Sequence, residues 1–316
     1  MQIIRKSRWL ALMPTFLFPS LVYASDINDL RIEPSSGKME VGEPLFIKVD
    51  LSYDTPRLHW RSGEPLKISK EEMLLEITHD GETEVVNPWG LSSGFGFIKK
   101  DTDGNQYGGY LPLFYRYNRD KKALPEMREK ALFFADPGEY AFRLLIGEVA
   151  SNLVTVEVRR SSAETSAALA ILDHPIDFGF LISSDIKPNQ SSEKRLRAIV
   201  EQCPSSVLAT YASTRLGITK YNELFDQHNN KGGIVFRSCY GNLTKGLALP
   251  TGCPMREEAL FLLACAEVIA GDYDKANQHA EMLTREYGDG RYQTKARELK
   301  SEIARIKQER GSEGEE

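Results

Sequence analysis

Hydrophobic and polar residues alternate in short runs between residues 26 and 160, and turn-forming residues separate these runs. A two-residue period predicts β-strands that bury one face. The clearest runs are 45–51, 73–78, 83–86, 138–144 and 153–158. The pattern therefore predicts an all-β sandwich domain over residues 25–160.

Two details sharpen the strand prediction. Asp80-Gly81 separates the runs 73–78 and 83–86, and an Asp-Gly pair between alternating segments is a strong hairpin signal because glycine accepts a positive φ. In the last run Val154, Val156 and Val158 share one side of the strand. We expect this valine face to be the buried one.

The period changes after residue 160. Alanine becomes frequent, and apolar residues recur at intervals of three and four, which predicts helices. Helices are predicted over 163–172, 191–202, 205–217 and 256–270, followed by one ending at 287 and one over 292–308. Residues 173–190 are predicted to be irregular or to form short pieces, and residues 228–254 are predicted to be a loop that interrupts the helices. The chain is thus expected to hold an all-α domain over 161–308 and a disordered acidic tail over 309–316.

The N-terminus has the pattern of a secretory signal. Arg5, Lys6 and Arg8 precede an uncharged apolar run over 9–23, and Ala24 ends it. A retained membrane anchor is the alternative, but a spanning helix needs about 20 apolar residues. We therefore expect residues 1–24 to be a signal peptide cleaved after Ala24. The mature protein would be secreted or periplasmic, with no transmembrane segment.

Net charge and chain length narrow the class of protein further. Net charge is −5, spread along the chain, whereas nucleic-acid binding needs a clustered basic face. About 290 residues remain after cleavage, enough for two domains. We expect no nucleic-acid partner.

The chain has four cysteines, all in its second half: Cys203, Cys239, Cys253 and Cys265. An exported protein with an even number of cysteines often forms disulfides, and four cysteines allow three pairings. Cys239 and Cys253 flank a glycine-containing segment and are the favoured pair. Cys265 lies in an apolar helical run and is expected to be a packed thiol. The spacing matches no zinc site, so no metal or other cofactor is expected.

A cluster of aromatic residues beside Gly108 and Gly109 is the candidate binding site. Exposed rings of this kind stack on sugars or anchor a partner protein. The alternative is that Phe114 and some of the tyrosines fill the sandwich core. The cluster consists of Tyr107, Tyr110, Phe114, Tyr115 and Tyr117.

The end of the β-rich region resembles a known fold. Pro137-Gly138-Glu139-Tyr140 leads into one strand, and Ser151-Asn152 leads into the valine strand. This arrangement resembles the last two strands of immunoglobulin-like sandwich domains of bacterial exported proteins. The resemblance implies a sandwich in which Tyr140 packs on or tethers the corner. Domains of this kind serve in binding and adhesion more often than in catalysis.

Residues 258–290 resemble a tetratricopeptide repeat, which is a pair of antiparallel helices whose small residues meet at the contact. Glu267 stands where a tyrosine is usual in such repeats, and residues 228–254 interrupt the spacing of the units. The resemblance implies paired helices that present a surface to a protein. The matching residues are Leu260, Leu263, Ala264, Gly271, Tyr273, Ala276, Ala280 and Leu283.

No catalytic motif stands out. The sequence contains no His-Glu-x-x-His, no Gly-x-Ser-x-Gly and no Walker motif. A dyad of His228 with Cys239 or Cys253 is the alternative to their disulfide. We therefore expect a non-enzymatic binding or scaffold protein of the cell envelope whose partner is a protein or another envelope component. A thiol- or carboxylate-dependent hydrolase and a glycan-binding protein are the alternatives.

Overall fold

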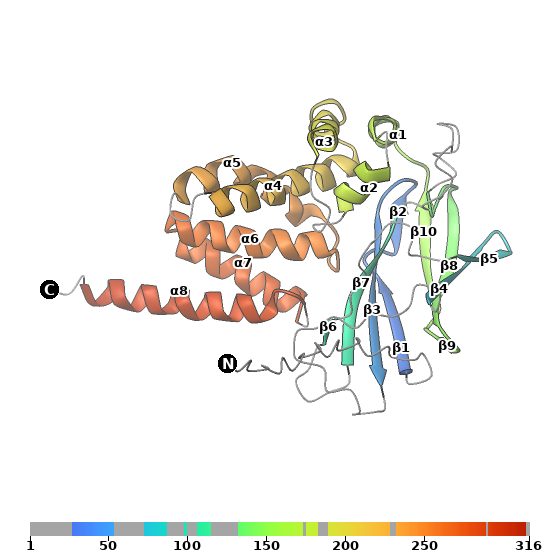
Figure 1. The fold of residues 1–316 in the computed structure, drawn as a ribbon, viewed down its shortest axis with the longest axis horizontal. Coiled ribbons are helices and arrows are strands. Elements are labelled where there is room, and N and C mark those ends of the chain that lie inside the picture. The colour runs from blue at the N-terminus through green and yellow to red at the C-terminus, as the bar shows by residue number, and fades with distance from the viewer. Residues whose placement is uncertain are drawn as a thin grey trace, which may run out of the picture.

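The computed structural model describes residues 27–53, 73–86, 98–99, 106–114, 132–172, 175–182, 189–227, 232–288 and 290–313. It has a β-rich N-terminal half and a helical C-terminal half, as the sequence predicts. Figure 1 shows the two halves side by side. The predicted signal segment 1–24 lies outside the described residues.

The β-rich half consists of two sheets that face each other. Sheet A has the order β1 (Ile27–Pro34), β3 (Leu45–Tyr53), β7 (Gln106–Leu113), β6 (Ile98–Lys99). Sheet B has the order β2 (Lys38–Glu40), β10 (Val154–Arg159), β8 (Gly138–Ile146), β4 (Met73–His79), β5 (Glu82–Val86), and β9 (Val149–Ala150) pairs with β8. All described pairs are antiparallel except β2 with β10.

Alternating side chains from both sheets fill one hydrophobic core. On β10, Val156 and Val158 are buried, whereas Val154 is only partly buried. The Asp-Gly hairpin also forms: Asp80 has φ 50°, Gly81 has φ 80°, and β4 pairs with β5 on either side of them. The two-residue period therefore correctly predicted both the buried valine face and this turn.

Tyr140 tethers the corner before β8. Its hydroxyl donates to the backbone oxygen of Asp136 at 2.9 Å and accepts from the Asp136 amide at 3.3 Å. The ring is buried against Phe134 and stacks on His79. The sequence predicted that Tyr140 would pack or tether here, and it does both.

Tyr140→Phe is expected to lower the free energy of unfolding by about 1 kcal/mol, because it removes the hydroxyl but keeps the packed ring. Urea unfolding of the two proteins would measure the difference. Tyr140→Ala, which also removes the ring, should cost about 3–5 kcal/mol. Equal losses for the two variants would contradict a separate contribution from the hydroxyl.

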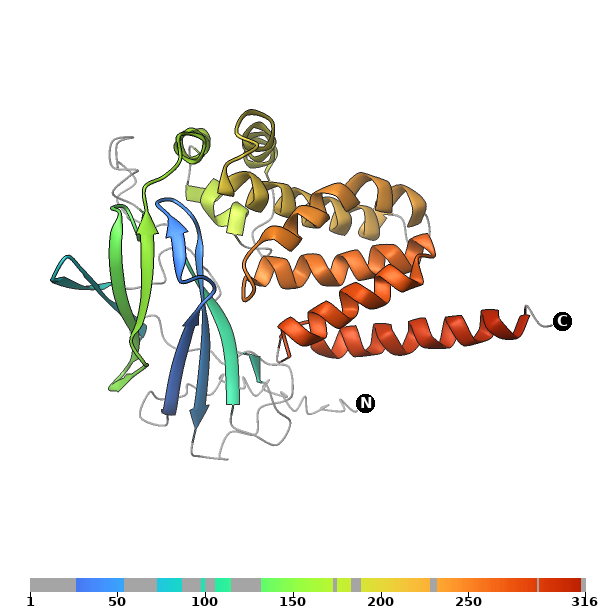
Figure 2. The same ribbon diagram turned by 180° about the vertical axis from the view of Figure 1, so that it is seen from behind.

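The helical half is a stack of helix pairs. In chain order the helices are α1 (Ala163–Ile171), α2 (Pro175–Ile182), α3 (Gln190–Gln202), α4 (Val207–Gln227), α5 (Gly232–Lys245), the 3₁₀ turn η5 (Gly246–Ala248), α6 (Pro254–Ala270), α7 (Tyr273–Glu286) and α8 (Gln293–Glu313). Helix α4 packs on α5 and α6 packs on α7, and α8 lies on the outer side of α7 (Figures 1 and 2). Within the described ranges, no single helix is both long and apolar enough to cross a membrane, although α1 and α2, bent by 118°, meet that criterion as a pair.

Three predictions about helix extent were wrong. Residues 228–254 contain α5, α4 continues past Gly217, and α8 extends to Glu313 rather than ending near 308. The eight-residue α2 agrees with the short pieces predicted for 173–190. Glycine usually weakens a helix, but at Gly217 it permits close packing: a Cβ there would lie 2.9 Å from the Leu243 amide nitrogen of α5. Contact between α4 and α5 therefore outweighs the local preference.

The helices lie against the outer face of sheet A, so that sheet A separates them from sheet B (Figures 1 and 2). Phe46, Phe114 and Leu132 of the β-rich half belong to the same buried cluster as side chains of α1, α2, α3, α4 and α6. The predicted boundary at residue 160 thus separates two kinds of secondary structure but not two independent cores. We call this contact region the junction.

Candidate functional site

The junction is built around the turn between β2 and β3, residues 41–44. The Val41 oxygen accepts from the Ser161 hydroxyl at 2.7 Å, and the Pro44 oxygen accepts from the Tyr211 hydroxyl at 3.3 Å. Gly42 has φ 82°, and a side chain there would clash with Leu169 of α1. The turn is therefore inserted between helices and is held by backbone as well as side-chain contacts.

Aromatic rings continue the junction along sheet A. Phe46 of β3 stacks on Tyr211 of α4, with ring centroids 6.3 Å apart. Phe114 contacts Phe178 of α2 edge-on at 5.1 Å. These three aromatic residues, Phe46, Phe114 and Tyr211, are each no more than 2% exposed, so they contribute to a core rather than to a surface.

The structure corrects part of the predicted aromatic site. Phe114 is in the core and is unavailable to a partner. Tyr107 and Tyr110 lie on β7, and Tyr110 is half-buried, whereas Tyr115 and Tyr117 lie outside the described residues. The core position of Phe114 agrees with the alternative prediction, but the ring packs against Phe178 of α2 rather than inside the sandwich.

Tyr110 faces the helical half across the junction. Burial raises the pKa of its hydroxyl well above the usual value, and the carboxylates of Glu257 and Asp50 raise it further. The Cys253 thiol and the Glu33 carboxylate contribute smaller effects. Tyr110 therefore lies among acidic groups that come from both halves of the chain, and it stays protonated at neutral pH.

Glu257 is the most deeply buried of these acids, with 1% exposure. Its Oε1 accepts the backbone amide of Tyr292 at 3.0 Å. Burial raises the pKa of its carboxyl to about 7. A side chain at Gly290 would clash with the same oxygen, so the loop before α8 closes tightly over this group.

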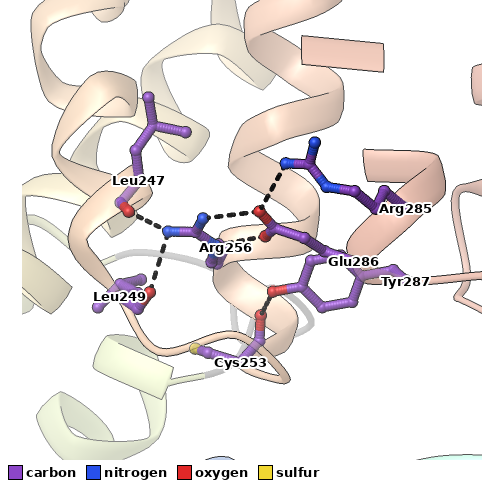
Figure 3. A network of polar contacts seen from close by, with 7 residues as sticks. All are labelled: Leu247, Leu249, Cys253, Arg256, Arg285, Glu286 and Tyr287. Atoms are coloured by element: carbon purple, nitrogen blue, oxygen red, sulfur yellow. Dashed lines mark hydrogen bonds and ion pairs between the residues drawn. The ribbon is translucent and has the colours of Figure 1, made fainter. Parts of the chain in front are cut away.

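Arg256, the preceding residue, holds the start of α6 to the end of α7 (Figure 3). Its Nε and Nη2 donate to Glu286 Oε2 and Oε1 at 2.8 and 3.1 Å, a bidentate pair. Its Nη1 donates to the backbone oxygens of Leu249, at 3.1 Å, and Leu247. This one guanidinium therefore connects α6, α7 and the turn that follows α5.

Tyr287 adds a second link at the same place. Its hydroxyl donates to the Cys253 backbone oxygen at 3.1 Å, just before α6 begins (Figure 3). Arg285 lies on the outside, with its Nη2 3.9 Å from Glu286 Oε1. The network fixes the first turn of α6, and with it Glu257, to the end of α7 and to the turn that follows α5.

A separate polar cluster lies near the other end of α6. Glu267 Oε2 is 2.7 Å from His279 Nδ1 of α7, and Glu267 Oε1 accepts from the Tyr240 hydroxyl of α5 at 3.1 Å. These bonds explain the buried Glu267 at a position where the tetratricopeptide pattern has tyrosine. In the part of the chain that the structure describes, no group of three His, Cys, Asp or Glu residues is placed to hold a metal ion.

The predicted Cys239–Cys253 disulfide is wrong, because all four cysteines are free thiols. Cys239 packs within α5 in a cluster with α4 and α6, whereas Cys253 packs at the start of α6 in the junction core. Their helices place them in different clusters, and the segment between them is largely helical rather than a loop. The Cys265 thiol is half-buried.

Burial also makes the thiols unreactive. It raises the pKa of Cys239 to about 11, of Cys253 to about 12 and of Cys265 to about 11, and it also raises that of Cys203. Because the thiolate is the attacking form, these groups are poor nucleophiles at neutral pH. His228, the proposed dyad partner, lies outside the described residues.

With Ellman's reagent, we expect the denatured, unreduced protein to show the absorbance change of four free thiols per chain. The native protein should react slowly. Mass spectrometry after alkylation without reductant checks the same point site by site. A denatured protein with only two reactive thiols would contradict the free state of all four. Reactivity at neutral pH that is as fast as that of a small free thiol would contradict their burial.

Sequence reasoning missed Arg256, Glu257 and Glu286. The available signal was the placement of charged residues inside an otherwise apolar helical run, where burial of a charge requires a partner. Their partners lie on other elements: Glu286 of α7 pairs with Arg256, and the Tyr292 amide before α8 binds Glu257, and nothing local in the sequence points to either contact.

The chain matches no family model and no curated protein. Among solved structures it is similar to a polysaccharide lyase at 9% identity and a TM-score of 0.20. The match covers 82% of this chain and 40% of the lyase chain, so this chain spans less than half the length of that protein. A TM-score this low carries no argument about fold or function.

Proposed function

We propose that this protein is an exported scaffold of the cell envelope that binds another protein. In this proposal, residues 1–24 direct export, the β-rich half is an immunoglobulin-like sandwich, and the helical half is a short tetratricopeptide-like stack. The junction carries the proposal, because a shared core holds two surfaces of different character in one fixed orientation.

Two local features support the family-level part of the proposal. The Tyr140–Asp136 tether is the kind of corner found in immunoglobulin-like sandwiches. Ala264, Ala276 and Ala280 are fully buried where α6 meets α7, and Gly271 ends α6 in the left-handed conformation. Small residues at the contact and a tight turn between helices are features of stacked helix pairs.

The position of the aromatic residues favours a protein partner over a glycan. Stacking on a sugar needs an exposed ring face, and Phe114 is in the core while Tyr110 is half-buried at the junction. The raised pKa values of the thiols likewise favour binding over thiol-dependent hydrolysis. We therefore place the contact surface on the exposed sides of the helix stack.

Site-specific photo-crosslinking in the intact producing cell tests the proposal. A crosslinker at Arg297, exposed on α8, should give one discrete protein adduct in the envelope fraction, and the isolated protein should begin at Ser25. The matched control carries the crosslinker at Leu153, 63% exposed on the sandwich away from the helices. Protein that starts at Met1 in the cytosol, or the same adducts from both positions, would contradict the proposal.

A further inference from the structure

The junction contains two carboxyl groups that are withdrawn from solvent, one from each half of the chain: Glu257 is buried and Glu43 is half-buried. Glu43 belongs to the turn that is inserted between the helices, and Glu257 belongs to the first turn of α6, whose Met255 packs in the core that the helices share with the sandwich. Each carboxyl group accepts a hydrogen bond from a backbone amide. Glu43 accepts from the Glu40 amide at 3.1 Å, and Glu257 accepts from the Tyr292 amide at 3.0 Å. Among the described residues, neither carboxylate has a cationic nitrogen within 4.0 Å.

The groups that face Glu43 do not favour its ionised form. Glu40 lies on its own turn, Tyr211 faces it from α4, and Cys253 faces it from the start of α6. None of these carries a positive charge. A carboxylate here therefore gains one backbone hydrogen bond while it loses part of its hydration.

Glu257 has a similar setting with one opposing effect. Glu258 adjoins it on α6, Tyr292 covers it from the loop before α8, and Tyr110 faces it from β7. Arg291 is the basic group close enough to lower its pKa, but it does so less than burial raises it. Asp50 and Glu33 of sheet A approach the same tyrosine, so an ionised Glu257 adds a like charge opposite them.

We propose that the junction is a proton-sensitive latch: protonated Glu43 and Glu257 keep the sandwich and the helices docked, and their ionisation loosens the contact. Opening lets water reach both carboxylates, so the open form is favoured when they are charged. The latch is formed by contacts within this chain, so its test does not require the partner of the proposed binding function.

The direction of the pH effect follows from the pKa changes. Burial raises the pKa of both carboxyls from 4.5 to about 7 in the folded state. The two carboxyls therefore stabilise docking fully below pH 4.5, where they are protonated. Their contribution falls as the pH rises toward about 7 and is absent above that value. The physiological consequence is a junction that is tighter in a mildly acidic medium than in a mildly alkaline one.

Hydrogen exchange of the full-length mature protein tests the latch. Protection factors, which correct for the intrinsic pH dependence of exchange, would be compared at about pH 5 and about pH 8 for peptides covering 41–46 and 253–258. We expect them to fall at least about tenfold in the wild type at the higher pH. The peptide covering 140–146, in the sandwich core, should keep its protection.

Variants separate the latch from a general pH effect. In the Glu43→Gln, Glu257→Gln protein, the side-chain oxygens of the two glutamines still accept the same hydrogen bonds from the backbone. Junction protection of this protein at about pH 8 should equal that of the wild type at about pH 5. Glu82→Gln replaces an exposed acid on β5, at the edge of sheet B, and should behave like the wild type. A flat wild-type profile overturns the proposal without any variant, and so does an unchanged profile in the double variant.

Discussion

A protein with Phe46 replaced by alanine is expected to be about 3–5 kcal/mol less stable than the wild type, with both halves affected together. Phe46 is 1% exposed and stacks on Tyr211, so its removal leaves a cavity between sheet A and α4. Because that cavity lies in a core shared by the two halves, the loss should lower the stability of the strands and of the helices equally.

Two probes distinguish the halves in a urea titration of this variant. Far-ultraviolet circular dichroism is dominated by the helices, and fluorescence reports on Trp60 and Trp89, the tryptophans that follow residue 24. We expect coincident transitions for both proteins, shifted together in Phe46→Ala. The control Leu153→Ala, at an exposed position, should stay within about 0.5 kcal/mol. Two separate transitions, only one of them shifted, would contradict a common core.

Replacing Arg256 with methionine is expected to cause the second large loss of stability. The change leaves Glu286, which is 13% exposed, without its bidentate partner and leaves the Leu247 and Leu249 oxygens without a donor. Breaking a buried ion pair on one side costs about 3–5 kcal/mol, since the remaining charge stays buried. Denaturant unfolding measures the loss.

Two matched variants show whether the loss comes from the buried charge. Adding Glu286→Leu to Arg256→Met should recover much of the stability, because the unpaired carboxylate is removed. Arg305→Ala breaks ion pairs with Glu302 and Glu309 on the exposed side of α8 and should change stability far less. Equal losses for Arg256→Met and Arg305→Ala would show that the Arg256 network does not hold the first turn of α6.

These separate contacts all lie around the first turn of α6, at the junction. Arg256 and Tyr287 fix the start of α6, Glu257 follows on the same turn, and that turn faces Tyr110 of the sandwich. A change in protonation at the junction therefore acts on the element that the polar network holds in place. The relative orientation of the two halves, on which the proposed scaffold role depends, is set here.

Part of the candidate site was predictable. Tyr110 was identified from aromatic clustering beside glycines, and it does lie at the contact between the halves. Phe114, from the same cluster, is in the core because α2 covers it, and α2 lies in a segment whose Pro175 and Gly179 predicted irregular structure. The disulfide prediction failed for a related reason: α5 occupies the segment that was expected to be a loop between Cys239 and Cys253.

The sequence by itself determined the local order of this protein: alternating strands first, paired helices afterwards, a hairpin at Asp80-Gly81 and a tethering tyrosine at 140. These features follow from side-chain periodicity and backbone preference, which act over a few residues. Only the tertiary structure decided that α4 passes through Gly217, that the turn 41–44 is inserted between helices, and that the start of α6 packs in a core shared with the sandwich. Those outcomes depend on contacts between residues up to about two hundred positions apart, where packing and desolvation outweigh local propensity.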